Sequence, residues 1–232
     1  MKKKYTHNEI VHNMKAPTII VPMILNILRE NDINISSVVD FWCGIWTWLA
    51  SFKDNGVPEI LWLDGERYKK TLLEKHIKNT QFKIVDLEKP IILEQSYDLV
   101  VSLEVAEHIS EDNVDTFIKS LTDAGKIILF SVAIPNQGGD HHINEQWPSY
   151  WIWKFLKHDY VFYDCIRDKI WDNPEIEVRY KQNIFLVTHK DITLNITQWY
   201  IYDIVHPEYW KRYEGVKSIF KMLLREIKKK FQ

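Results

Sequence analysis

Three aspartates follow three short apolar segments at nearly constant spacing. Asp40 lies near the end of SSVVDF, Asp64 ends EILWLD and Asp86 ends FKIVD, at separations of 24 and 22 residues. Each separation fits one strand and one helix, so a parallel sheet would bring the three carboxylates to one edge. A carboxylate after the second strand can accept both hydroxyl protons of a ribose, and one after the next strand can accept from the amino group of adenine. The alternative for each aspartate is a helix cap.

A second group of candidate residues lies in GGDHHINEQW, after a later apolar segment. His142 is the first candidate for a general base, because a neutral imidazole accepts a proton near pH 7, and His141 and Glu145 are second choices. The same three residues could bind a divalent ion, but adjacent histidines with one acid do not define a metal site, and we predict none. Glu107 and His108 in EVAEHIS are a weaker candidate for a base, or form part of a pocket wall. The alternative for the loop histidines is hydrogen bonding to backbone.

Apolar segments alternate with amphipathic ones along most of the chain. A leading helix is predicted over 16–32, where apolar residues recur at helical spacing. Strands are predicted at 36–41, 59–64, 82–86, 97–103, 125–133, 160–166 and 183–189, and helices at 47–56, 66–77, 111–121 and 148–159. Alternation of this kind predicts an α/β fold, with a mostly parallel sheet covered by helices on both faces. Ligands of such sheets bind beyond the carboxyl ends of the strands.

The chain is predicted to hold one domain with an extension at each end. We place a helical extension at 1–35, the α/β domain at 36–190 and a C-terminal extension at 191–232. Within the last of these, EGVKSIFKMLLREIKKKFQ groups apolar residues against basic ones, which is typical of an amphipathic helix. Such a helix can make weak contact with an anionic membrane surface, or it can dock on its own domain or on a neighbouring subunit.

The composition limits the classes of partner. A formal net charge of −2 gives no general electrostatic reason to expect nucleic acid, so we predict none. Two cysteines make no disulfide framework, and MKKKYTHNEI lacks the apolar stretch of a secretory signal. A run of about eighteen apolar residues, as a bilayer span needs, is also absent from the sequence. We therefore expect a cytoplasmic protein.

The order of these motifs resembles that of the class I S-adenosylmethionine-dependent methyltransferases. Their first motif reads D-x-G-x-G-x-G, and DFWCGIW matches it at Asp40 and Gly44. LWLDGE is similar to their second motif, IVDLEKP to their third and YDLVVSLEVAEHI to their fourth. HHINEQWPSYW resembles a bacterial branch that acts on small molecules or on glycan and lipid precursors. The resemblance covers roughly residues 12–190 and implies a three-layer Rossmann-like α/β fold, with a seven-stranded, mostly parallel sheet and a reversed final hairpin.

The resemblance also implies a site for S-adenosylmethionine as the cofactor. The turn at 41–45 would wrap its methionine part, Asp64 beside Gly65 would hold the ribose, and Asp86 with Leu87 would meet the adenine. Residues 102–104 would close the pocket. The implied cofactor-binding residues are Asp40, Phe41, Trp42, Cys43, Gly44, Ile45, Asp64, Gly65, Asp86, Leu87, Ser102, Leu103 and Glu104.

Tryptophan stands at three positions where the family commonly has glycine. Trp42 and Trp46 lie in the first motif, and Trp62 precedes the ribose aspartate. Glycine takes a positive φ cheaply and lets backbone approach a ligand, whereas a bulky residue there costs about 1–2 kcal/mol and its side chain would exclude the cofactor. The chain has 10 tryptophans but only 7 glycines. We hypothesise that UGA codons meaning glycine in the source were translated as tryptophan. The alternatives are a site rearranged around the indoles and a genuine loss of cofactor binding.

The function that the resemblance implies is methyl transfer from S-adenosylmethionine to an oxygen, nitrogen or carbon atom. The acceptor would be a small molecule or a glycan or lipid precursor. The alternative is a catalytically inactive binding protein of the same fold, in which Trp42 and Trp46 fill the cofactor pocket. A nicotinamide-dependent oxidoreductase is a weaker third possibility, because its fingerprint is G-x-G-x-x-G. The aromatic residues at 147–153 either line a substrate pocket or, in our interpretation, mostly pack in the core.

Overall fold

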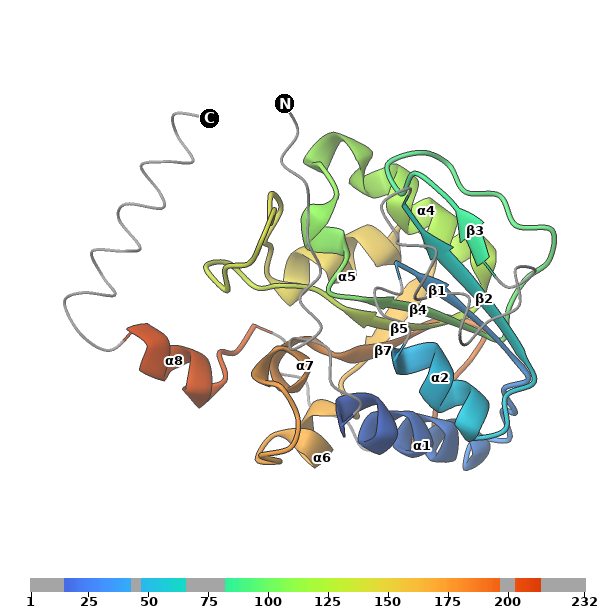
Figure 1. The fold of residues 1–232 in the computed structure, drawn as a ribbon, viewed down its shortest axis with the longest axis horizontal. Coiled ribbons are helices and arrows are strands. Elements are labelled where there is room, and N and C mark those ends of the chain that lie inside the picture. Colours follow the sequence, from blue (N-terminus) through green and yellow to red (C-terminus); the bar gives the residue numbers. More distant parts are fainter. Residues whose placement is uncertain (1–14, 43–46, 66–81, 197–202, 214–232) are drawn as a thin grey trace.

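Seven strands form one mixed sheet in the computed structural model of the chain, which describes residues 15–42, 47–65, 82–196 and 203–213 (Figure 1). Their order across the sheet is β3-β2-β1-β4-β5-β7-β6. The strands are β1 (Ser37–Phe41), β2 (Glu59–Asp64), β3 (Phe82–Ile84), β4 (Leu99–Leu103), β5 (Ile127–Ser131), β6 (Tyr160–Tyr163) and β7 (Phe185–His189).

The first five strands along the chain run in the same direction, and in the final hairpin only β7 runs against them. β1 pairs in parallel with both β2 and β4, β2 with β3, and β4 with β5. β7 pairs antiparallel with β5 on one side and with β6 on the other. The predicted seven-stranded, mostly parallel sheet with a reversed final hairpin is therefore confirmed.

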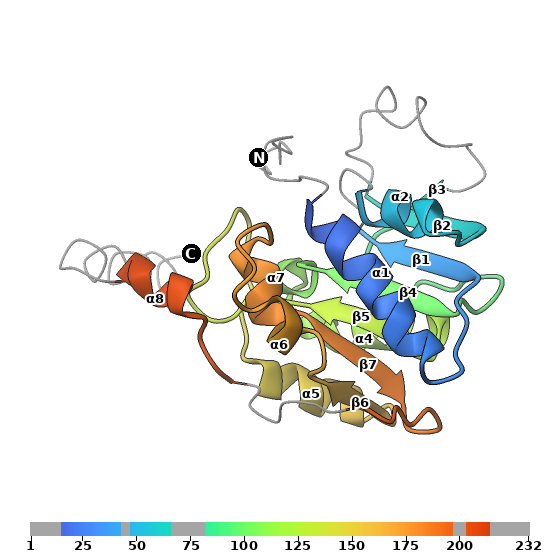
Figure 2. The ribbon, with the colours of Figure 1, turned by 90° about the horizontal axis from the view of Figure 1, so that it is seen from below.

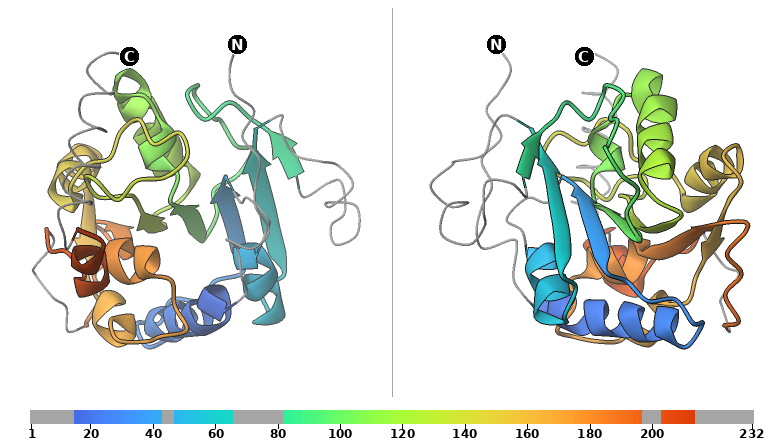
Figure 3. Two further views of the ribbon diagram at one scale, coloured as in Figure 1. Left: turned by 60° about the vertical axis from the view of Figure 1, so that its left-hand side comes forward. Right: turned by 90° about the vertical axis from the view of Figure 1, so that its right-hand side faces the viewer.

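Helices cover both faces of the sheet, because the parallel strands are apolar on both sides. α1 (Lys15–Arg29), α2 (Thr47–Asp54), α6 (Arg167–Ile170) and α7 (Val178–Asn183) cover one face (Figure 2). α4 (Val114–Ala124) and α5 (Pro148–Leu156) cover the other, and the two views of Figure 3 show the twisted sheet between these layers. Two single 3₁₀ turns, η3 (Ala106–His108) and η4 (Glu111–Asn113), lead into α4, and α8 (Pro207–Tyr213) lies beyond the sheet.

The main elements lie close to their predicted positions. β2 has the predicted bounds, while β6 and β7 are shorter than predicted, and the short helices α6, α7 and α8 were not predicted. The predicted helix at 66–77 and the basic helix at the C-terminus lie outside the described residues. Among the residues that are described, none belongs to a helix both long and apolar enough to cross a membrane.

Several of the tryptophans have well-defined environments. Trp62 on β2 is 1% exposed and packs in the core beneath the sheet with Trp48 of α2, and Trp151 of α5 is fully buried on the other face. The interpretation that most aromatic residues at 147–153 belong to the core is only partly right, because Trp153 is 62% and Trp147 37% exposed. Only one side of the short helix α5 faces the sheet, so Trp153 on its other side contacts solvent.

Two polar contacts tie distant parts of the domain together. Asp98, just before β4, accepts hydrogen bonds at Oδ2 from the backbone of Ser36 and Ser37, at 2.8 and 3.0 Å, and from the Ser36 hydroxyl at 2.6 Å. On the other side of the sheet, the guanidinium of Arg167 is fully buried against Asp164, with an Nε to Oδ1 distance of 2.9 Å, and it also donates to the carbonyl of Gln182. The first contact fixes the start of β1 beside β4, and the second fixes α6 against α7.

Candidate functional site

The candidate site lies at the carboxyl ends of the central strands. β1 is flanked by β2 and β4, and the chain runs outward from it in both directions, so the topological switch point lies between β1 and β4. In the register, Asp40 on β1 lies opposite Trp62 on β2 and Val101 on β4. Residues that follow these strands therefore converge on one edge, which is where open α/β sheets bind ligands.

Two of the three predicted aspartates lie close together at this edge. Asp40 is 3% and Asp64 5% exposed. Burial raises the pKa of Asp40 well above its usual value, and the nearby Asp64 raises it further. The Asp64 carboxylate accepts a hydrogen bond from the Gly65 amide at 2.6 Å. Asp86 is different, because it is exposed beyond the end of β3, where its carboxylate caps its own loop and pairs with Lys89 at 3.1 Å.

The turn after β1 begins in a backbone conformation that favours glycine. Trp42 has a φ of +75°, and its amide donates to the carbonyl of Leu63 at 2.8 Å. Its indole reaches across the switch point and stacks on the imidazole of His108, with ring centroids 5.3 Å apart and planes tilted by 32°. The rest of the first motif, Cys43, Gly44, Ile45 and Trp46, lies outside the described residues. Glycine at 42 would leave the backbone unstrained and remove the ring from between the strand ends.

The end of β4 is held by groups from three other segments. Glu104 has a φ of +55°, and its amide donates to both the carbonyl and the hydroxyl of Ser131 at 3.0 Å. Its carboxylate accepts from Gln137 Nε2 at 2.8 Å and from Asn183 Nδ2 at 3.0 Å. Leu103 is half-buried at the same edge, and Ser102 is fully buried within the strand. Leu87, after β3, is buried in the core beneath the adenine position that the resemblance implies.

The loop after β5 places His142, but not the His141 side chain, inside the site. His141 has a φ of +58° and is exposed. His142 Nδ1 lies 2.9 Å from Glu145 Oε1, and that carboxylate also accepts from the amides of Asn136 and Gly138. A carboxylate can only accept, so the His142 ring carries its hydrogen on Nδ1 and, when neutral, its lone pair on Nε2.

The backbone of Gly139 packs closely against one side of the His142 ring. A Cβ placed on Gly139 would lie 2.1 Å from His142 Nε2, which is closer than any real contact allows. Residue 139 must therefore be glycine for the ring to keep its position.

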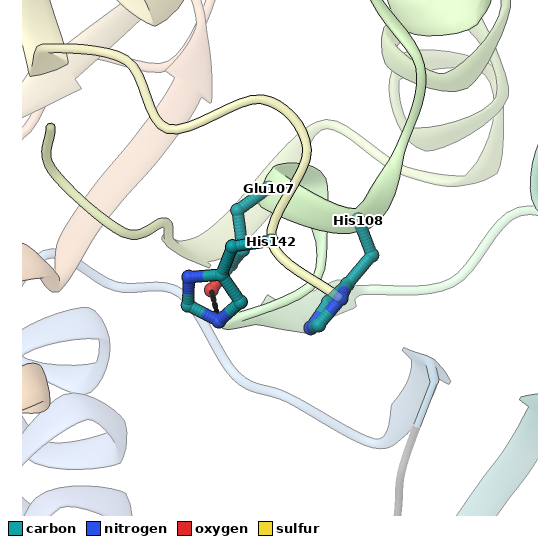
Figure 4. A group of neighbouring side chains, drawn as sticks. All are labelled: Glu107, His108 and His142. Carbon is teal, nitrogen blue, oxygen red and sulfur yellow. Dashed lines mark ion pairs between the residues drawn. The ribbon is translucent and has the colours of Figure 1, made fainter. Parts of the chain in front are cut away.

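Glu107 and His108 lie beside His142, although they come from a different loop (Figure 4). They form most of the 3₁₀ turn η3 after β4. The Glu107 carboxyl is fully buried, and its Oε1 lies 3.8 Å from His142 Nε2. His108 Nδ1 lies 3.1 Å from the carbonyl of His141, and its ring makes an edge contact with that of His142, with centroids 5.0 Å apart.

Sequence reasoning missed part of this site. Gln137 and Asn183 hold Glu104, yet neither belongs to a motif, and Asn183 comes from the short helix α7 near the other end of the domain. Glu107 was placed only as a weak candidate, because burial of its carboxyl depends on the loop that folds over it. The doubled glycine of GGDHH was the one signal that could have indicated a close approach to His142.

The comparisons with known proteins identify the fold. No protein-family model and no curated protein sequence matches the chain. Among solved structures, an S-adenosylmethionine-dependent methyltransferase from Clostridium acetobutylicum is 12% identical, with a TM-score of 0.52 over 78% of this chain and 94% of that one. CalS10, an amino pentose methyltransferase from Micromonospora echinaspora, is 8% identical, with a TM-score of 0.57 over 82% of this chain and 100% of that one. The small RNA methyltransferase HEN1 is 16% identical, with a TM-score of 0.51 over 89% of this chain and 28% of HEN1.

This chain has the class I methyltransferase fold. The strand order and the reversed hairpin agree with that assignment. The structural similarity to solved methyltransferases, which extends over most of the chain, agrees with it as well. The resemblance noted from the sequence motifs is therefore confirmed at the level of the fold. Within the methyltransferase fold, the switch point holds Asp40, Asp64 and Trp42 on one side and the group around His142 on the other.

Proposed function

We propose that the protein is an S-adenosylmethionine-dependent methyltransferase, with glycine rather than tryptophan at 42 in its native form. The observation that carries this proposal is the pair of features at the ends of β1 and β2. A buried carboxylate, Asp64, follows β2, and the turn after β1 starts with a φ of +75°. Both are what a nucleoside cofactor requires of this fold, since a carboxylate accepts from ribose hydroxyls and a glycine turn lets backbone approach the ligand.

The residues present fit S-adenosylmethionine at all but one described position. Asp64 would hold the ribose, and Leu87 offers an apolar surface to the adenine, with Asp86 at its rim. The indole of Trp42 does not fit, because it crosses the switch point to reach His108. Two similar solved structures are SAM-bound CalS10 and PKMT2 from Rickettsia typhi in complex with AdoHcy, which supports this choice of cofactor.

The chain's own contribution to the reaction would be alignment, exclusion of water and acceptance of one proton. The bound cofactor supplies a methyl group on a positively charged sulfur, so an aligned nucleophile can displace it without a covalent intermediate. His142 is suited to accept the acceptor's proton, because Glu145 holds Nδ1–H and so leaves the lone pair of the neutral ring on Nε2. His141 would contribute only its backbone carbonyl, which orients His108.

The proposed acceptor is a small molecule or a glycan or lipid precursor. This choice rests on the resemblance of the 141–151 segment and on the formal net charge of −2, which provides no general attraction for polyanions. HEN1, one of the similar structures, is by its name a small RNA methyltransferase, so an RNA oligonucleotide belongs in any acceptor screen.

A second candidate function is an inactive binding protein of the same fold. The contact between Trp42 and His108 favours it, because a stacked indole closes the switch point on the side where the methionine part of the cofactor would lie. In that protein the three tryptophans would be genuine, and UGG codons at 42, 46 and 62 in the coding DNA would support that interpretation.

The deciding experiment is calorimetric titration of S-adenosylmethionine into two proteins, the sequence as written and its Trp42→Gly, Trp46→Gly, Trp62→Gly variant. Asp64→Asn in the glycine background is the matched control, because it removes the ribose acceptor and keeps the side-chain size. We expect binding only by the glycine variant, and loss of that binding with Asp64→Asn. Binding by neither protein would support the inactive alternative, and equal binding by both would contradict the steric role assigned to Trp42.

A further inference from the structure

Three side chains with metal-ligating atoms meet beside the switch point. One ligand atom from each of Glu107, His108 and His142 lies within 4.8 Å of the other two (Figure 4). Glu107 and His108 come from η3 after β4, and His142 comes from the loop after β5. Residues from two segments therefore converge on one point at the ligand edge of the sheet. The spacing allows small side-chain adjustments to bring all three to bonding distances of about 2.0–2.2 Å from one ion.

The Glu107 carboxyl provides an independent indication of a bound cation. It is fully buried, and within the described part of the chain no donor makes a hydrogen bond of normal geometry to either oxygen, the backbone amides of Glu107 and Ala133 interacting with it only weakly. His142 Nε2 lies 3.8 Å from Glu107 Oε1, which is beyond hydrogen-bonding distance. A buried carboxylate without well-formed hydrogen bonds is costly unless something such as a cation compensates its charge.

Both imidazoles have an oxygen acceptor at Nδ1, which is a common arrangement for metal-binding histidines. The carboxylate of Glu145 holds the Nδ1 side of His142, and the carbonyl of His141 holds the Nδ1 side of His108. A carbonyl and a carboxylate accept only, so the neutral rings carry their lone pairs on Nε2. Carboxylate and carbonyl partners of this kind fix the tautomer and raise the basicity of histidines that bind metals.

We propose that Glu107, His108 and His142 form a binding site for one divalent transition-metal ion. Two imidazoles and one carboxylate suit Zn²⁺, Mn²⁺, Fe²⁺ or Co²⁺ better than Mg²⁺ or Ca²⁺, which prefer oxygen ligands. Three protein ligands also leave a position open for a substrate oxygen. The site differs from the trio of His141, His142 and Glu145 weighed from the sequence, because the His141 side chain is exposed and Glu145 contacts His142 instead.

The proposed ion also bears on the choice of acceptor, and this step rests on the proposed methyltransferase function. A divalent ion beside the switch point would polarise an acceptor oxygen and lower the pKa of its hydroxyl. The site would then favour acceptors that carry a hydroxyl group over amines and carbon nucleophiles. His142 would in that case act as a ligand, and proton acceptance would pass to solvent.

The test is titration of chelator-treated protein with Co²⁺, followed by visible absorption and calorimetry, without S-adenosylmethionine. We expect one saturable site per chain whose absorption is lost when Zn²⁺ is added. Glu107→Gln and His142→Gln should each weaken Co²⁺ binding at least about tenfold. Mutation of a residue that only orients a metal ligand commonly lowers metal affinity about 10–100-fold, so loss of a ligand should cost no less. His141→Gln is the matched control, because it keeps the carbonyl that orients His108 and should bind Co²⁺ as the parent does.

The two proposals can fail separately. Unchanged Co²⁺ affinity in Glu107→Gln and His142→Gln, or no saturable binding by the parent, would overturn the metal site. Glu107→Gln is the safer of the two for folding, since a neutral amide of the same shape replaces a buried acid, and its urea midpoint checks this. Co²⁺ binding by a protein that does not bind S-adenosylmethionine, even with glycine at 42, 46 and 62, would leave the metal site standing and overturn the methyltransferase assignment.

Discussion

Replacing Trp42 with glycine and with alanine should separate backbone strain from side-chain bulk. Both variants lose the contact between the Trp42 indole and His108. The contribution of that contact therefore cancels when their free energies of unfolding are compared. At a φ of +75°, alanine keeps a strain of about 1–2 kcal/mol that glycine lacks, and glycine's greater freedom in the unfolded chain costs about 0.5–1 kcal/mol. From the midpoints of these ranges, Trp42→Gly should be more stable than Trp42→Ala by roughly 0.8 kcal/mol, which is about 2–3 °C in Tm for a chain of this size.

The assay is urea unfolding of both variants, with the same pair of substitutions at an exposed helical position as the control. Trp153 on α5 is 62% exposed, so there the order should reverse, with alanine more stable than glycine by about 1 kcal/mol. An alanine variant at 42 as stable as the glycine variant would refute the claim that this backbone is built for glycine. It would also remove the structural support for a miswritten codon at that position.

Three further substitutions test the framework around the site. Gly125→Ala should lower the free energy of unfolding by about 1–3 kcal/mol in urea titrations, because its Cβ would lie 2.4 Å from the Tyr97 carbonyl oxygen, part of the backbone just before β4. Burial alone would raise the pKa of Asp98, but hydrogen bonds from two serines lower it overall. Asp98→Asn should therefore be less stable than the parent at neutral pH, and the gap between their urea midpoints should close as pH falls below about 4, through the lowered folded-state pKa. Arg167→Met should cost about 3–5 kcal/mol in the same assay, since it leaves Asp164 charged and buried, and adding Asp164→Leu should recover most of that loss.

The fold could be predicted from the sequence because its signal is local. Strands such as 59–64 are short apolar runs that end in a polar residue, and each carries its own pattern. The short helices α6 and α7 escaped prediction because four to six residues hold too little periodicity, and packing against the sheet stabilises them instead.

The site could be predicted only in part, because its assembly is not local. Asp40 and Asp64 were found through their positions at strand ends, and the structure places them together. The partnership of Glu107 with His142 depends on how the loop after β5 folds back over η3, and no spacing in the sequence encodes that path. His141 and His142 are adjacent and chemically identical, so only the backbone conformation could show which imidazole turns inward.

The hydrogen bonds between Ser36 and Asp98 join residues 62 positions apart, at the centre of the sheet. A nascent chain that has completed β1, β2 and β3 therefore still exposes one edge of β1 until β4 leaves the ribosome. Non-local pairings of this kind close slowly, because loop entropy is lost before the contacts form. We expect refolding of this protein to be limited by docking of β4 against β1, and its incomplete chains to be the species that aggregate or recruit chaperones.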